Sequence, residues 1–345
     1  MSAFASAAEI KVGVIGYGGA FNMGRAHLQQ MQLAGMTPLA VVELNEERLA
    51  VAREEFPGIQ TYTTVEAMLA ESDVNLVTLI TPHDTHASLA LQCLRAGKHV
   101  CVEKPMAVTT DDCREMAAEA EARGLVVTTY HNRHWDGCIL KARRQILDER
   151  LIGDVVRIEA CNGRHGLPGS WWRSSKSVSG GVLYDWGVHL TEYALQLIDD
   201  EMVEVFGVAH RGRWNSECSW GEDTNEDEAT AVVRFKGGAM FTLRVSQLEA
   251  EPPEFAVKVT GTHGCYSFSP HGGYRVVSFQ NGERFEANGK EQESEGWRYY
   301  QNVADHLVDD AALIITAAWS TRPIHVLDLA CRSAAEGRTL PVEIP

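Results

Sequence analysis

The chain has 345 residues, too many for one ordinary hydrophobic core, so its length alone indicates two domains. Its composition is globular, with 45% hydrophobic and 23% charged residues. The 47 acidic and 31 basic residues give a net charge of −16, which argues against a nucleic-acid partner and against an anionic membrane surface.

Cysteine spacing and the first residues predict the setting of the protein. The eight cysteines are scattered without a C-x-x-C pair, so we expect reduced thiols and neither a metal site nor a disulfide framework. The first ten residues lack the basic and apolar segments of a signal peptide, and no run approaches the ~18 apolar residues that span a bilayer. We therefore expect a cytoplasmic protein.

Apolar runs alternate with helical periods from residue 11 to about residue 129. The strand candidates are residues 12–15, 39–42, 76–80, 100–102 and 126–129, and helices are expected at 46–56, 85–96 and 110–123. Near-continuous apolar strands separated by helices are typical of a parallel sheet covered on both faces. The pattern predicts an α/β fold, with a doubly wound parallel sheet in an amino-terminal domain at residues 9–130.

The pattern changes after Tyr130. A helix expected at 137–149 is followed by polar–apolar alternation at 155–160, 203–210, 229–235, 239–245 and 255–260, with further helices at 181–198, 300–318 and 326–336. Alternation of this kind suits an antiparallel sheet with one solvated face. Residues 131–345 are therefore expected to form a second, α+β domain.

A glycine-rich loop follows the first strand. Glycines between a strand and a helix allow a tight turn and close backbone approach to a pyrophosphate. The G-x-G-x-x-G pattern fails at Phe21, and the next glycine is Gly24, so the loop is longer than usual. An ordinary glycine turn is the alternative. The cofactor-binding candidates in this loop are Gly16, Gly18, Gly19, Ala20, Phe21, Asn22 and Met23.

Glu43 ends the second strand and predicts which coenzyme binds. A carboxylate there accepts hydrogen bonds from a ribose 2′-hydroxyl and repels a 2′-phosphate. Neither Leu44 nor Asn45 offers a compensating cation, so NAD is favoured over NADP. Arg48 is a further cofactor-binding candidate. A solvated glutamate at the start of a loop is the alternative interpretation of Glu43.

Two more strand ends carry candidate residues. Thr81, Pro82, His83 and His86 follow the third predicted strand and suit a nicotinamide ribose, although a capping or surface role for His86 is an even alternative. Glu103-Lys104-Pro105 follows the next strand, where open parallel sheets bind their ligands. Proline restricts the residue before it, so Lys104 is held in an extended direction.

The start of the second domain adds cations and aromatic rings. His131, Asn132 and Arg133 are expected to line a cleft between the domains, with His131 and Arg133 binding the substrate and Asn132 the cofactor. Arg164, His165, Trp172 and Arg173 suit a polyhydroxylated ligand, because sugar faces stack on indoles while hydroxyls need fixed donors and acceptors. Packing between domains is the commoner role of a tryptophan pair. The acidic stretch at 222–228 is expected to be a solvated loop.

Asp185 and His189 stand four residues apart in a predicted helix that follows Gly180-Gly181. On a helix they share one face, and a carboxylate that orients a histidine suits a general acid or base near neutral pH. An exposed ion pair contributing a few tenths of a kcal/mol is the alternative.

These motifs together resemble the Gfo/Idh/MocA family, named after glucose–fructose oxidoreductase, inositol dehydrogenase and a rhizopine-catabolism protein. The resemblance rests on the glycine loop, T-P-x-x-x-H, A-G-K-H-V-x-x-E-K-P, W-R and G-G-x-L-x-D-x-G-V-H. It implies an amino-terminal Rossmann domain and a carboxyl-terminal domain whose open, largely antiparallel sheet builds homodimers or homotetramers. Glu192 departs from the aspartate that many members have there.

The resemblance also implies roles for single residues. Lys104 matches a lysine that contacts cofactor and substrate hydroxyl, with Glu103 facing the cofactor, and His189 matches the proton acceptor beside Asp185. We expect hydride transfer between NAD and a secondary alcohol of a sugar, glycoside or cyclitol. Two alternatives remain: a glycosidase that uses NAD for transient sugar oxidation, and a non-catalytic NAD-binding sensor.

Overall fold

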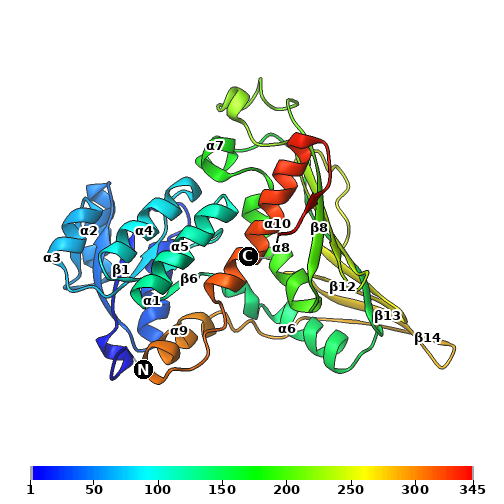
Figure 1. Cartoon of the computed structure of the whole chain (residues 1–345), viewed down its shortest axis with the longest axis horizontal. Helices are drawn as coiled ribbons and strands as arrows, with labels where there is room; N and C mark the ends of the chain where they lie inside the picture. Colours follow the sequence, from blue (N-terminus) through cyan, green and yellow to red (C-terminus); the bar gives the residue numbers. More distant parts are fainter. Residues whose placement is uncertain (1–2, 344–345) are drawn as a thin grey trace. The chain divides into compact units, whose positions relative to one another are not determined.

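The structure, a computed structural model, describes residues 3–343 and divides into two compact units (Figure 1). The first unit joins Met1–Asn132 to Trp297–Thr321, and the second joins Arg133–Gly296 to Arg322–Pro345. The expected division at residue 130 assigned 297–321 to the second domain, whereas these residues pack with the first unit. Sequence periodicity shows which face of a helix is buried and does not show against which domain.

A six-stranded parallel sheet forms the centre of the first unit. Its strands are β1 (Lys11–Ile15), β2 (Thr37–Val42), β3 (Gln60–Tyr62), β4 (Leu76–Leu79), β5 (His99–Val102) and β6 (Val127–Thr129). Their order is β3-β2-β1-β4-β5-β6, and every neighbouring pair is parallel, which confirms the predicted doubly wound sheet. The sequence analysis missed β3, because three partly exposed residues carry too little periodic signal.

Six helices accompany this sheet in the described part of the chain. They are α1 (Met23–Leu33), α2 (Glu46–Glu55), α3 (Val65–Glu71), α4 (His86–Arg95), α5 (Thr110–Arg123) and α9 (Arg298–Asp309). Local capping sets several starts: the side chains of Asn45, Thr64 and Thr109 each accept a backbone N–H in the first turn of α2, α3 and α5. The beginnings of these helices are therefore encoded locally.

The second unit contains a nine-stranded sheet. Its strands are β7 (Val155–Gly163), β8 (Met202–His210), β9 (Glu228–Phe235), β10 (Met240–Ser246), β11 (Val257–Gly261), β12 (Gly264–Ser269), β13 (Gly273–Gln280), β14 (Glu283–Gly289) and β15 (Leu340–Pro341). The order is β14-β13-β12-β11-β7-β10-β9-β8-β15, and only β7 and β10 pair in parallel. This confirms the open, largely antiparallel sheet. Strands β12 to β15 were not predicted.

The helices of the second unit are α6 (Gly137–Arg143), α7 (Lys176–Ser179), α8 (Leu183–Leu197) and the part of α10 (Ala317–Glu336) that follows Thr321. Helix α8 packs against β10 and β7, and α10 meets the same sheet where Ala330 lies against Gly207 (Figure 1). The predicted helix at 300–318 instead ends at Asp309, and α10 starts at Ala317, before the predicted residue 326, because it continues through Pro323.

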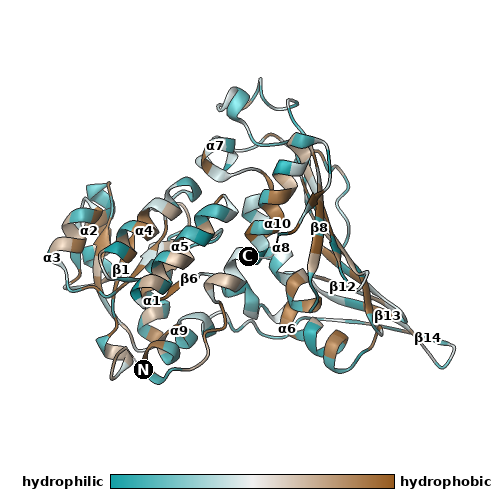
Figure 2. Ribbon diagram, in the orientation of Figure 1, coloured by the Kyte–Doolittle hydropathy of each residue, from teal (hydrophilic) through white to brown (hydrophobic). Residues whose placement is uncertain are grey.

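The apolar residues concentrate along the strands and the inward faces of the helices (Figure 2). Helix α8 is almost wholly buried, so its polar residues are held by the fold. Within residues 3–343, no helix is both long enough and apolar enough to cross a bilayer.

Candidate functional site

A candidate dinucleotide site of the first unit lies where the strand order reverses, between β1 and β4. Ligands of doubly wound sheets bind at this point, beyond the carboxyl ends of the strands. Gly16 follows β1 with a φ of +100°, and a Cβ there would lie 2.2 Å from the carbonyl oxygen of Ile80, which follows β4. Only glycine fits so close to the neighbouring strand end.

The rest of the glycine loop also has the form that a dinucleotide needs. Nothing lies within 4 Å of a Cβ built on Gly18, so its backbone is open to a ligand. Gly24 lies in the first turn of α1, where a Cβ would come within 2.5 Å of the Tyr17 ring. Gly24 therefore gives the close helix packing that the third glycine of the usual pattern gives, and α1 starts at Met23 after a left-handed Asn22.

Glu43 and Arg48 flank this loop from the end of β2 and the start of α2. The Glu43 carboxylate accepts the backbone N–H groups of Tyr17 at 2.7 Å and Asn45 at 3.1 Å. The Arg48 guanidinium donates to the Tyr17 carbonyl at 3.0 Å and to the Asn22 side chain at 3.4 Å. The cation that is missing at positions 44 and 45 is therefore supplied from position 48, which removes the main argument against NADP.

The loop after β4 is rigid. The hydroxyl of Thr85 donates toward the Thr81 hydroxyl and the Pro82 carbonyl, both at 2.7 Å, and His83 is buried. This strand end, the glycine loop and Glu43 together fit a dinucleotide. The glycine loop offers an open backbone at the start of a helix, Glu43 offers an acid for a ribose, and the loop after β4 offers fixed groups on the other side of the switch point.

Two predicted cofactor contacts are turned into the protein. His86 is 1% exposed, and its ring nitrogens lie 2.8 Å from the Pro105 carbonyl oxygen and 3.0 Å from that of Thr81. Burial lowers its pKa, while the two carbonyl oxygens act in the opposite direction. The carboxylate of Glu103 likewise binds the buried His27 and the backbone N–H of Lys104. Both residues therefore support the Lys104 loop, and their contact with the cofactor stays a prediction.

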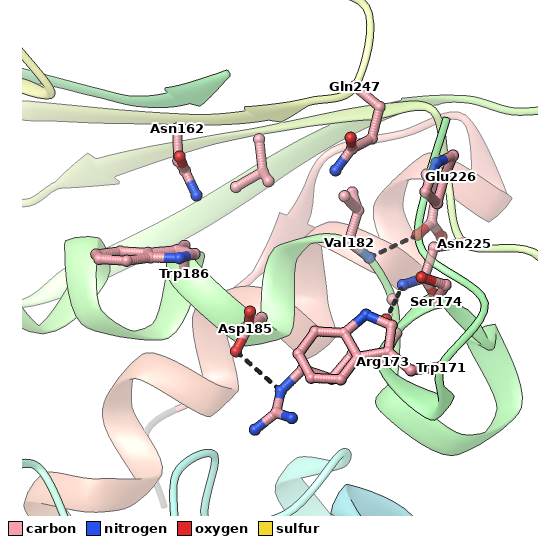
Figure 3. Close-up of a pocket in the computed structure, with 13 residues that line it drawn as sticks. Asn162, Trp171, Arg173, Ser174, Val182, Asp185, Trp186, Asn225, Glu226 and Gln247 are labelled. Carbon is pink, nitrogen blue, oxygen red and sulfur yellow. Dashed lines mark hydrogen bonds and ion pairs between the residues drawn. The ribbon is translucent and has the colours of Figure 1, made fainter. Parts of the chain in front are cut away.

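A separate pocket of about 130 Å³ lies wholly within the second unit (Figure 3). Asn162 ends β7, and Val245 is its partner in the parallel register with β10, so both reach the same edge of the sheet. Gln247 lies two residues further on the same side. Asp185 and Trp186, from the first turn of α8, face these residues across the pocket (Figure 3).

Arg173 is fixed by aromatic rings and a carboxylate. Its guanidinium carbon lies 4.7 Å from the ring centre of Trp171 and 4.3 Å from that of Trp172, and its Nε lies 3.4 Å from Asp185. Cation–π contacts of this kind hold a guanidinium while leaving its other edges able to bind. Arg173 therefore presents a positioned donor in the pocket, between a carboxylate and two indole surfaces.

Helix α8 carries the predicted acid–base pair. Asp185 is half-buried at the pocket, and His189, one turn later, is 5% exposed with its ring 5.8 Å from that of Trp186. The ion pair that Asp185 makes is with Arg173, so this carboxylate faces the pocket. Orientation of His189 by Asp185 stays a prediction.

A buried ion pair anchors the start of α8. Lys176 Nζ lies 2.7 Å from Glu226 and 2.7 Å from the Gly180 carbonyl oxygen, and the other oxygen of Glu226 accepts the Val182 N–H at 3.0 Å. Gly181, at φ +127°, makes room for it, because a Cβ there would lie 2.5 Å from Lys176 Nζ. Burial opposes ionisation of Glu226, but the Lys176 charge and these hydrogen bonds lower its pKa.

Glu226 corrects the prediction of a solvated loop at 222–228. Residues 224–227 are all buried, and Asn225 and Glu226 line the pocket. The sequence signal was present in the alternation of short polar residues with acids directly before a strand, but a run of acidic residues is usually solvated.

Comparison with known proteins agrees with this geometry. The profile of the oxidoreductase family with an NAD-binding Rossmann fold matches residues 10–131, and the profile of the GFO/IDH/MocA carboxyl-terminal domain matches residues 140–267. The chain belongs to the Gfo/Idh/MocA family. It is therefore an oxidoreductase of the class that uses a nicotinamide coenzyme.

Several relatives are similar over most of the chain. The scyllo-inositol 2-dehydrogenase (NADP(+)) IolW of Bacillus subtilis is 23% identical over 97% of this chain and 96% of its own. The myo-inositol 2-dehydrogenase of Thermotoga maritima is 26% identical over 74% of each chain. The structure of a levoglucosan dehydrogenase aligns with a TM-score of 0.81 at 19% identity, over 97% of this chain and 100% of that one. Some relatives with higher identity match over only about half of their own length.

Not every predicted substrate residue of this Gfo/Idh/MocA chain lies at the pocket. Arg164 and His165 are exposed in the loop after β7 and do not line it. Arg133 binds Asp136 at 2.8 Å and stacks on Trp186 at 4.9 Å, so it supports the pocket wall. His131 and Asn132, which end the first unit, lie outside the pocket as well.

Glu192, the departure from the family pattern, faces the interior of the second unit. Its carboxylate lies 2.5 Å from His134 Nδ1 and accepts from Gln196 at 2.8 Å. It does not line the pocket. The longer side chain thus fits a structural pair with His134, and the departure does not affect the pocket directly.

The sequence analysis missed Asn162, Gln247 and Trp186 among the pocket residues. Asn162 and Gln247 are single amides at strand ends, and their convergence depends on the pairing of β7 with β10. Trp186 stood next to Asp185 in a motif that was already singled out, so its position could have been inferred from helical spacing.

Replacing Glu226 by Ala is expected to lower the free energy of unfolding by about 3 kcal/mol, because it leaves the Lys176 charge buried without its carboxylate. The folded-state pKa of Glu226 is lowered, so its stabilisation is present above an unfolded pKa of about 4.3 and is lost as the pH falls through the folded value. Urea titrations of both proteins should therefore converge toward low pH. The exposed Glu222→Ala variant is the control and should change stability by less than about 0.5 kcal/mol; an equal effect of both would contradict the buried pair.

Proposed function

We propose that the chain oxidises or reduces one secondary alcohol of a sugar, glycoside or cyclitol with a nicotinamide dinucleotide. When bound, the nicotinamide supplies or accepts the hydride. The observation that carries the proposal is the pocket at the start of α8, where Asp185, Arg173, two amides and indole surfaces converge in a chain that also retains Lys104 after β5.

In this mechanism His189 takes the hydroxyl proton from the substrate and returns it in the reverse direction. Asp185 lies one turn earlier on α8 and fixes the reacting hydroxyl and the imidazole. Lys104 donates to the same oxygen and stabilises the negative charge that develops there. The buried setting of His189 keeps bulk water from the proton it holds.

The composition of the pocket favours a neutral polyol. Its charged lining residues are Arg173, Asp185 and Glu226; Arg173 pairs with Asp185, and Glu226 pairs with Lys176 outside the lining, so the pocket has no excess cation for a phosphate or carboxylate. Asn162 and Gln247 supply amide donors and acceptors for hydroxyls, and the Trp171 and Trp186 rings supply flat apolar surfaces. The names of the inositol dehydrogenase relatives support cyclitols as the first substrates to test.

NAD is the proposed coenzyme, with Glu43 on the adenosine ribose and Arg48 as the group that would tolerate NADP. We further propose a cytoplasmic homodimer or homotetramer. Its interface would use the outer face of the second sheet, where Phe206, Val208 and Met240 are 40–41% exposed and where β8 is strongly apolar (Figure 2).

Arg48→Gln should weaken NADPH binding about tenfold and change NADH binding less than about twofold, because only the 2′-phosphate needs the cation. Fluorescence titration with each reduced coenzyme measures this. Arg53→Gln is the matched control on the same helix, since Arg53 binds Glu46 and Thr61 instead of the glycine loop. An equal loss of both coenzymes in the Arg48 variant would assign Arg48 to the shared part of the dinucleotide.

His189→Ala should lower turnover by roughly 10²–10⁴-fold and leave NADH affinity near normal, because it removes only acid–base help. The assay mixes NAD or NADP with scyllo-inositol, myo-inositol and nitrophenyl glycosides and follows reduced coenzyme and aglycone release. Release of aglycone without net coenzyme reduction would instead identify the glycosidase reaction. Turnover that survives both His189→Ala and Lys104→Ala would sink the mechanism.

Gln247→Leu keeps the side-chain size and removes the amide. It should raise the KM for the polyol about tenfold with a smaller change in kcat, since the amide binds a hydroxyl that does not react. Gln292→Leu, outside the pocket, is the control. A fall in kcat with unchanged KM would show that Gln247 acts on the reacting centre instead.

A further inference from the structure

Two buried histidines contact the Lys104 loop, Glu103-Lys104-Pro105, one on each side of Lys104. On one side His27, on α1 and 0% exposed, lies with Nε2 3.1 Å from the Glu103 carboxylate. On the other side His86 lies against the carbonyl oxygen of Pro105. Lys104 is thus the middle residue of a tripeptide whose two flanking residues are each tied to a buried imidazole.

The His27 side of this bracket continues into a chain of hydrogen bonds. His27 Nδ1 lies 2.6 Å from the Tyr300 hydroxyl, which in turn lies 3.3 Å from the hydroxyl of Thr78 on β4. Tyr300 belongs to α9, in the segment that returns to the first unit after the second. Residues from α1, β4, β5 and α9 therefore meet at Glu103.

The direction of each hydrogen bond follows from the chemistry of the groups. Burial opposes ionisation of Glu103, but the His27 hydrogen bond and the nearby positive charges lower its pKa, so its carboxylate only accepts. His27 therefore donates from Nε2 to this carboxylate. The tautomer that carries its proton on Nε2 can accept the Tyr300 proton at Nδ1, and the Tyr300 oxygen can then accept from Thr78. In this arrangement every donor of the chain has an acceptor.

The end of this chain is the backbone of the lysine. The second oxygen of Glu103 accepts the Lys104 N–H at 2.9 Å, and the Glu103 N–H itself donates to the Leu79 carbonyl at 2.9 Å. The His27 ring cannot turn away, because the Tyr130 ring centre lies 4.2 Å from its own. A fixed imidazole thus holds the carboxylate, and the carboxylate holds the peptide from which the lysine side chain extends.

We propose that His27 and Tyr300 are positioning residues for Lys104 and act through Glu103. The inference rests on the proposed role of Lys104 at the cofactor and the reacting hydroxyl. Misplacement of such a group by about 1 Å costs up to about 10²-fold in rate, so a rigid support is functionally significant even though none of its members touches the substrate.

A pair of adjacent tyrosines allows a sharp test. Tyr299 and Tyr300 are both buried on α9, and each hydroxyl lies 3.3 Å from a threonine hydroxyl, Thr128 for Tyr299 and Thr78 for Tyr300. Only Tyr300 also contacts His27. Tyr299→Phe and Tyr300→Phe should therefore have similar melting temperatures, while differing at Lys104.

Two measurements report on Lys104 without any substrate. The first is the dissociation constant of NADH, expected to rise about tenfold in Tyr300→Phe and to stay within about twofold in Tyr299→Phe. The second is the rate of reductive methylation of the Lys104 amine with formaldehyde, read by peptide mass spectrometry against the exposed Lys258. It should rise at least about threefold in Tyr300→Phe alone, because a less firmly held loop opens more often.

Glu103 provides the conservative rescue. In Glu103→Gln the amide can still accept the Lys104 N–H and donate to His27, which must then accept at Nε2 and donate from Nδ1 to Tyr300. The variant should lose less NADH affinity than Glu103→Ala, and ¹⁵N NMR of His27 should show the tautomer reversed from that of the wild type. The reversal would show that the Glu103–His27 hydrogen bond exists in solution, and the difference in NADH affinity between the two variants reports its effect at Lys104.

The proposal is overturned if Tyr300→Phe and Tyr299→Phe agree in NADH affinity and in Lys104 methylation, or if His27 keeps one tautomer in Glu103→Gln. If instead the proposed function is wrong, Lys104→Ala will leave NADH affinity and the turnover of inositols unchanged. That result does not depend on how Tyr300→Phe changes the methylation of Lys104.

Discussion

Acidic side chains in this protein are held by backbone N–H groups at the points where strands and helices end. Glu43 accepts from Tyr17 and Asn45 beyond β2, Glu103 accepts from Lys104 beyond β5, and Glu226 accepts from Val182 at the start of α8. Such N–H groups lack partners within their own element and carry partial positive charge. A buried carboxylate satisfies them and is stabilised in return.

This constraint explains how a chain with a net charge of −16 buries Glu226 and keeps Glu43 and Glu103 partly buried. A carboxylate without partners in the interior would cost several kcal/mol, or would be protonated. Each of the three acids instead has a cation or an imidazole near it in addition to its backbone N–H donor. Lys176 pairs with Glu226, His27 binds Glu103, and Arg48 lies near Glu43 on the other side of Tyr17. These side chains therefore have their partners before any ligand binds, and little further ordering of them is needed on binding.

The sequence predicted the parts of this arrangement that depend on local pattern. Alternating apolar runs indicated the parallel sheet, and motif spacing placed Gly16, Glu43, Lys104 and Asp185 at strand ends or in a helix turn. Long-range pairing could not be read in the same way. Arg48 reaches the glycine loop only because α2 starts at Asn45 and turns it back, and Glu226 is buried only because α7 brings Lys176 to it.

The partners of single side chains could not be predicted for the same reason. His86 and Glu103 follow strands whose ends bind ligands, so their position indicated cofactor contact but did not reveal their partners within the protein, Pro105 and His27. A motif fixes where a Cα lies in the fold, whereas the direction of a polar side chain depends on which buried donor or acceptor is nearest. An acid or an imidazole is stabilised more by a hydrogen bond to a buried group that would otherwise lack a partner than by an exposed position that faces a ligand.

Residues 297–321 belong to the first unit because buried polar groups of that unit need them as hydrogen-bond partners. Thr128 on β6 donates to the carbonyl of Ile315 at 2.6 Å, and Tyr300 satisfies His27. Both groups belong to the first unit, are buried, and find their partners more than 170 residues away in sequence. The nucleotide-binding unit is thus complete in space only after the chain has built the second unit. A domain limit drawn at residue 130 separates strand β6 and helix α1 from the groups that complete their hydrogen bonds.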